Sequence, residues 1–164
     1  MSLGQRVSTD HQLARLLQIG VVLEELVEAR AERHLEELDP SKRAALDDEV
    51  EELLAEAAVE SAEHRDRVAA LLDELDAETT RFEQIEALVE EHYSAPGNTD
   101  GVLYDQLFSE ETAYKFYDDL IAAIEDSDTE FSVDREEVLA TLREIRAEEE
   151  KGVEDVAAIM EARE

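Results

Sequence analysis

The chain has 164 residues, a length that suits one domain able to bury roughly 70% of the surface its unfolded chain exposes. It carries 46 Asp and Glu against 15 Lys and Arg, and its formal net charge of -31 disfavours nucleic acid and anionic membranes as partners. The basic residues include few lysines, Lys42, Lys115 and Lys151. Such a surface is typical of halophilic proteins, because high salt screens the repulsion between like charges.

The residues that are absent limit the chemistry and the location of the protein. Without cysteine, the chain forms no disulfide and offers no thiol nucleophile, Cys-ligated zinc or iron–sulfur cluster, so its chemistry must use O and N ligands. No stretch approaches the ~18 apolar residues of a membrane span, and the first residues contain no continuous apolar segment. We therefore expect a cytoplasmic protein that binds no membrane.

Few Gly and Pro residues and frequent Ala, Leu, Glu and Arg predict an all-α chain. The first helix is expected to begin at an N-cap at Thr9 or Asp10, and Ser132 is expected to cap the last helix. Thr80 and Glu83 have the spacing of a capping box, which predicts a short helix after the second long one. The expected helices cover about 10–38, 47–75, 81–92, 102–125 and 133–162.

The lengths of the connections predict the topology. Short connections after the first and third long helices form antiparallel hairpins, whereas about 25 residues between the second and third allow the chain to travel the length of a bundle. The two halves also repeat: "EVEELLAEAAVESAEHRDRVAALL" aligns with "EVLATLREIRAEEEKGVEDVAAIM", and "EARAERHLEEL" aligns with "EETAYKFYDDL". This repetition favours a duplicated helical hairpin, within a single domain that spans residues 1–164.

Polar residues interrupt the apolar seams of these helices. The seam of the last helix advances in steps of four and three, but Glu149 and Gly152 lie where the core of a bundle should be driest. The aligned repeats place Ser61 on Glu149 and His64 on Gly152, and they place Glu28 on Glu110. The first helix reaches Glu28 through a seam that contains Leu17, Gly20, Glu24 and Val27.

One layer of the core is therefore expected to hold Glu28, His64, Glu110 and Glu149. Each buried ion costs several kcal/mol unless it is compensated, and no Lys or Arg lies on these seams to pair with the carboxylates. A divalent cation would compensate the charge. Carboxylate oxygens with one imidazole nitrogen suit iron, manganese or zinc.

The order of these residues resembles that of the ferritin-like di-iron carboxylate proteins, especially rubrerythrin-type domains. The segment "EETAYKFY" of this chain is similar to the signature of the first or third helix in those proteins. The resemblance implies a ferritin-like bundle in which Glu28 and Glu110 are single ligands, His64 is the imidazole of the second helix and Glu149 is the carboxylate of the fourth. The ligand set departs from the family at Ser61, where the family has Glu, and at Gly152, where it has His. The neighbouring residues Glu60 and Glu148 are candidate replacements for the missing ligands, although their positions beside the apolar seams direct their side chains away from the centre of the bundle.

The resemblance implies iron as the first candidate metal and oxidoreductase chemistry of the di-iron type, such as iron oxidation or peroxide reduction. The incomplete ligand set leaves a second interpretation open: a metal-free ferritin-fold module with a structural or protein-interaction role. In that interpretation, Glu28 tilts to the surface and His64 is a core histidine hydrogen-bonded to one buried Glu. We expect a homodimer in either case.

Overall fold

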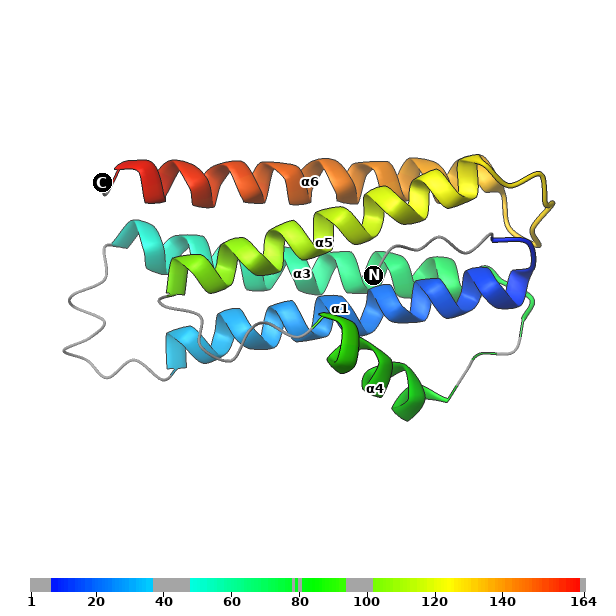
Figure 1. The fold of residues 1–164 in the computed structure, drawn as a ribbon, viewed down its shortest axis with the longest axis horizontal. Helices are drawn as coiled ribbons and strands as arrows, with labels where there is room; N and C mark the ends of the chain where they lie inside the picture. Colours follow the sequence, from blue (N-terminus) through cyan, green and yellow to red (C-terminus); the bar gives the residue numbers. More distant parts are fainter. Residues whose placement is uncertain (1–6, 37–47, 78, 80, 94–101, 163–164) are drawn as a thin grey trace.

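The structure is a computed structural model that describes residues 7–36, 48–77, 79, 81–93 and 102–162 (Figure 1). The described chain is all α, and a helix is present at each of the five predicted places. The predicted end of the first helix at about 38 and start of the second at about 47 lie outside the described residues. The helices are α1 Asp10–Glu36, α3 Asp48–Glu74, α4 Phe82–Tyr93, α5 Val102–Glu125 and α6 Arg135–Ala162. The described helices lack the combination of length and apolar content that crossing a bilayer requires.

The four long helices form a bundle in which α1 packs on α3 and α5 packs on α6, and both pairs are antiparallel (Figure 1). Further contacts join α1 to α5 and α3 to α6, which closes the bundle. The end of α3 and the start of α5 lie at opposite ends of the bundle, so the predicted crossover is confirmed. The short helix α4 belongs to this connection and packs against α1 on the outside of the bundle.

Side chains at the helix starts explain where two of the helices begin. Thr9 caps α1, because its hydroxyl accepts the backbone N–H of Gln12 at 3.0 Å. The predicted cap of α6 is wrong: the carboxylate of Asp134 accepts the N–H of Glu136 at 3.0 Å, while the Ser132 hydroxyl accepts the N–H of Asp76 at 2.8 Å. Ser132 therefore holds the turn against the end of α3. The predicted capping box involves Thr80, which lies outside the described residues.

A polar layer divides the core of the bundle into two apolar clusters. The larger cluster takes its residues from the first half of α1, the end of α3, α4 and the α5–α6 hairpin as far as Ile145. The smaller one lies at the other end and contains Val50, Leu54 and Ile159. Between them, every long helix contributes a buried polar side chain, and these include Glu24, Ser61, His64, Gln106, Ser109, Glu110 and Glu149. The predicted interruption of the seams is therefore a real layer of the core.

Candidate metal centre

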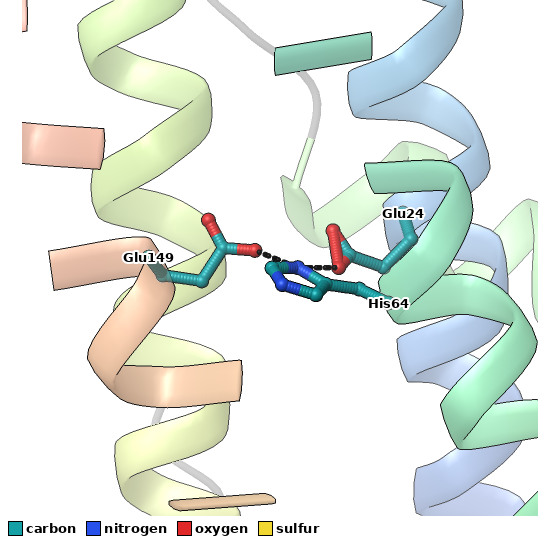
Figure 2. Close-up of side chains that lie close together, drawn as sticks. All are labelled: Glu24, His64 and Glu149. Carbon is teal, nitrogen blue, oxygen red and sulfur yellow. Dashed lines mark hydrogen bonds and ion pairs between the residues drawn. The ribbon is translucent and has the colours of Figure 1, made fainter. Parts of the chain in front are cut away.

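His64 lies at the centre of the polar layer, between carboxylates from two other helices (Figure 2). Its Nδ1 is 3.0 Å from Oε2 of Glu24 on α1 and 2.9 Å from Oε1 of Glu149 on α6. Almost none of their surface is accessible to solvent: 1% for His64, 0% for Glu24 and 2% for Glu149. Two carboxylates and an imidazole thus meet at one point that water does not reach directly.

A second group of carboxylates shares Glu149 with the first. Glu60, Glu110 and Glu149 each offer an oxygen within 4.8 Å of the others, as do the donor atoms of Glu24, His64 and Glu149. Glu110 is buried and accepts a hydrogen bond from the Gln106 amide at 2.9 Å, whereas Glu60 is half-buried. Because Glu149 belongs to both groups, the two form one continuous cluster.

The structure brings three of the four predicted residues together and places the fourth beside them. His64, Glu110 and Glu149 lie in the cluster, whereas Glu28 is part of neither group. The Glu28 carboxylate accepts a hydrogen bond from the Arg65 guanidinium at 2.6 Å, so a basic residue outside the seams pairs with it. The helix α1 instead supplies Glu24, one turn earlier.

Glu60 and Glu148, the candidate replacement ligands, lie in different positions relative to the cluster. Glu60 reaches the second group despite its position beside the seam, and it remains half-buried. Glu148 stays partly exposed and lies outside both groups, but its carboxylate is 3.2 Å from Nε2 of His64 and 3.1 Å from the Arg67 guanidinium. Glu148 thus contacts the outer side of the imidazole, while Glu24 and Glu149 contact the inner side.

Sequence reasoning overlooked Glu24 and the contact that Tyr117 makes with it. The phenol of Tyr117 is completely buried and donates a hydrogen bond to Oε2 of Glu24 at 3.2 Å. The other oxygen of Glu24, Oε1, is buried without a hydrogen-bond partner among the described residues. The seam of the first helix already contained Glu24, so the signal was present in the four-three spacing.

Gly152 provides the space that the Glu110 carboxylate occupies. A Cβ atom at Gly152 would lie 2.5 Å from Oε2 and 2.8 Å from Cδ of Glu110, well inside the contact distance of real side chains. The absence of a side chain at Gly152 therefore lets Glu110 reach the cluster from α5.

Burial makes the neutral forms of the carboxyl groups more favourable. It raises the pKa of Glu110 to about 9, with a further increase from the nearby charge of Glu149, and raises the pKa of Glu149 to about 7. Burial alone would lower the pKa of His64, but hydrogen bonds and charges from Glu149 and Glu24 outweigh it and raise the pKa to about 11. In the metal-free protein, His64 is therefore an imidazolium that compensates the surrounding carboxylates.

These shifts predict that the metal-free protein loses stability as the pH rises. Glu110 and His64 both have pKa values raised above those of the unfolded chain, so the stability they contribute is present at low pH. The Glu110 contribution is lost as the pH rises through about 9, and that of His64 as it rises toward about 11. We expect the free energy of unfolding to fall by about 1 kcal/mol or more per unit between pH 7 and 9.

Urea unfolding in the presence of a chelator, at fixed salt and at pH 7, 8 and 9, measures this slope. Exposed carboxylates are already ionised in this range, so their repulsion stays constant. Glu110→Gln removes one of the two groups and should make the slope shallower. Stability that is constant or rises between pH 7 and 9 would show that the buried groups do not hold these protons.

The cluster therefore offers four carboxylates and one imidazole, from all four long helices, and all of them except Glu60 are buried. Oxygen donors with a single nitrogen donor can bind a divalent metal, and removal of the His64 proton would free a ring nitrogen as a ligand. No family model, curated protein or solved structure matches this chain.

Proposed function

We propose that this protein binds divalent metal ions in its polar layer, as a rubrerythrin-like or ferritin-like bundle with an altered ligand set. The observation that carries the proposal is the unpartnered Oε1 of Glu24, a buried carboxylate oxygen within a group of three donors. A buried acceptor without a partner costs about 1 to 3 kcal/mol, more if it is charged, and a metal ion would satisfy it. The topology of the bundle, with its single crossover, supports the same assignment.

The two overlapping groups would hold metal at two adjacent positions, with Glu149 as a ligand common to both. We define position 1 by Glu24, His64 and Glu149, and position 2 by Glu60, Glu110 and Glu149. Position 1 combines oxygen with nitrogen, which suits iron, manganese or zinc, whereas position 2 offers oxygen only, which suits manganese or another hard cation. Iron is our first candidate for position 1, and bound iron would supply redox chemistry with oxygen or peroxide.

The hydrogen bonds of His64 support its role as a ligand. Its Nδ1 faces Glu24 and Glu149, the carboxylates of position 1, while its Nε2 faces Glu148. A ligating histidine usually donates its second N–H to a carboxylate or carbonyl, which fixes the tautomer and the orientation of the ring. Glu148 is placed to accept that bond when Nδ1 binds metal.

Metal content per chain tests the proposal. Purified protein is loaded separately with Fe2+ under anaerobic conditions, Mn2+ and Zn2+ at high salt, freed of excess metal and measured by elemental analysis. We expect up to two ions per chain for the native protein and the same number for Glu28→Gln, because Arg65 holds Glu28 outside the cluster. A folded protein that retains none of the three metals at micromolar concentration would contradict the proposal.

Gly152→Ala should remove an ion while changing stability little. The new Cβ would displace the Glu110 carboxylate, which lies at the end of a flexible side chain, and position 2 would lose a ligand. Replacing Gly by Ala within a helix contributes about 1 kcal/mol of stability, which offsets part of the displacement. We expect one ion per chain in the variant, measured by elemental analysis. Gly20→Ala, where the Cβ would contact the edge of Phe116 at 3.2 Å, is the control that should keep both.

The charge of His64 favours a second candidate function. An imidazolium between Glu24 and Glu149 compensates the core without any metal, as a structural or partner-binding bundle would require. A well-folded protein that binds no metal would support this alternative, and stoichiometric binding that disappears with Glu149 would exclude it.

A further inference from the structure

The proposed metal positions need a route from solvent, because their ligands are almost completely buried. Glu24, His64, Glu110 and Glu149 keep 5% or less of their exposed surface. Glu60 is the half-buried member of the two groups. A cation that reaches the layer through the described part of the chain therefore meets Glu60 as its most accessible ligand.

Glu60 also lines an open pocket on the outer surface of α3. The pocket has a volume of about 410 Å³, and its lining residues are Ala55, Glu56, Val59, Glu60 and Glu63. All of these residues lie on α3, and the pocket is open to solvent, so a hydrated divalent cation can approach the Glu60 carboxylate directly. Glu60 thus belongs both to this surface pocket and to the buried cluster.

The charge of the pocket favours cations. Glu56, Glu60 and Glu63 are spaced by four and three residues, which places their carboxylates on one face of α3. The positive charge of Lys151 on α6 interacts with Glu56 and Glu60 and so opposes the attraction of cations, although Lys151 forms its own ion pair with Asp155 at 3.0 Å. The side chain of Lys151 is three-quarters exposed, so its charge is partly screened by solvent.

We propose that this α3 pocket is the access route for divalent cations, with Glu56 and Glu63 attracting the hydrated ion and Glu60 passing it to position 2. This inference rests on the proposed metal-binding function. It also predicts the order in which metal ions bind and exchange. Position 2 fills and exchanges its ion first, because Glu60 belongs to it, whereas the ion at position 1 exchanges more slowly because Glu149 separates that position from Glu60.

The rate of Zn2+ uptake by the metal-free protein tests the route, measured by stopped flow with a fluorescent indicator for free Zn2+. The variant Glu56→Gln/Glu63→Gln should bind the native number of ions but take them up about threefold to tenfold more slowly at low salt. Lys151→Gln should accelerate uptake by about twofold, because it removes the opposing charge. Both differences should shrink at 1 M salt, where the screening length is about 3 Å.

Two further variants separate the route from a general effect of charge. Glu136→Gln/Glu137→Gln makes the same change of charge in the first turn of α6 and should leave the rate unchanged. Val59→Trp places a larger side chain beside Glu60 without changing the charge of the pocket, and should slow uptake at every salt concentration. Stoichiometric binding with native rates in the pocket variants, or equal slowing in the α6 control, would overturn the route alone. A protein that binds no Zn2+ at equilibrium would overturn both the route and the metal site.

Discussion

Glu149→Ala is expected to abolish tight metal binding at both positions. Glu149 is the residue shared by the two groups of donors, so its loss removes a ligand from each. Mutations of residues that only support metal ligands typically weaken binding by about 10-fold to 100-fold, and loss of a ligand common to both positions should exceed that range. We expect less than one ion per chain by elemental analysis after the same loading that gives up to two in the native protein.

The neighbouring residue supplies the matched control. Glu150 is exposed and lies outside both groups, so Glu150→Ala makes the same chemical change without touching the cluster. It should keep the native metal content and affinity. If both variants lose metal equally, the ions are held by the general acidity of the surface and the buried cluster is not the site.

His64→Ala is expected to destabilise the metal-free protein by about 3 to 5 kcal/mol at pH 7, because it leaves buried carboxylates without their cation. The Nδ1 of His64 lies within 3.0 Å of both Glu24 and Glu149, and nothing else among the described residues brings a positive charge to both of them at such distances. Part of the loss should be recovered at pH 5, where the buried carboxyl groups of Glu24 and Glu149, left without the imidazolium, take up protons more easily. Urea unfolding with a chelator at the two pH values measures both effects.

His34→Ala provides a comparison at a partly exposed histidine. The Nε2 of His34 lies 2.7 Å from the Asp105 carboxylate, but its side chain keeps 24% of its exposed surface. Ion pairs in such positions contribute about 1 kcal/mol or less. A loss at His64 no greater than the loss at His34 would contradict the view that His64 compensates the polar layer.

The sequence was sufficient for the fold because the helical signals agree with one another. Seam spacing, low Gly and Pro content and the lengths of the connections all predicted four long helices with one crossover, and this topology is confirmed. The cap of α6 was missed because Ser132 and Asp134 are both good caps by residue type. Only the tertiary contact between Ser132 and Asp76 distinguishes them. Homodimerisation stays a prediction.

The polar layer was predictable as a feature, but its exact members were not. Glu149 and His64 lie on seams bracketed by apolar residues, so their burial followed from spacing. Alignment of the two repeats favoured Glu28 over Glu24, although Glu24 lay on the seam itself. The choice between carboxylates one turn apart depends on neighbours such as Arg65, which pairs with Glu28.

Glu60 shows a different limit of sequence reasoning. A long side chain beside a seam can reach the core even when its Cα does not face it. The space available depends on the partner helix, and here the absence of a side chain at Gly152 allows Glu110 to approach from α5. The composition of position 2 therefore depends on packing between helices that no single seam describes.

Anomalous diffraction from crystals of the zinc-loaded or manganese-loaded protein tests the metal site most directly. We expect two peaks on either side of the Glu149 carboxylate, one beside Glu24 and Nδ1 of His64, the other beside Glu60 and Glu110. Loaded crystals without a peak in the polar layer, in which His64 still bonds to both Glu24 and Glu149, would show that an imidazolium occupies the place assigned here to metal.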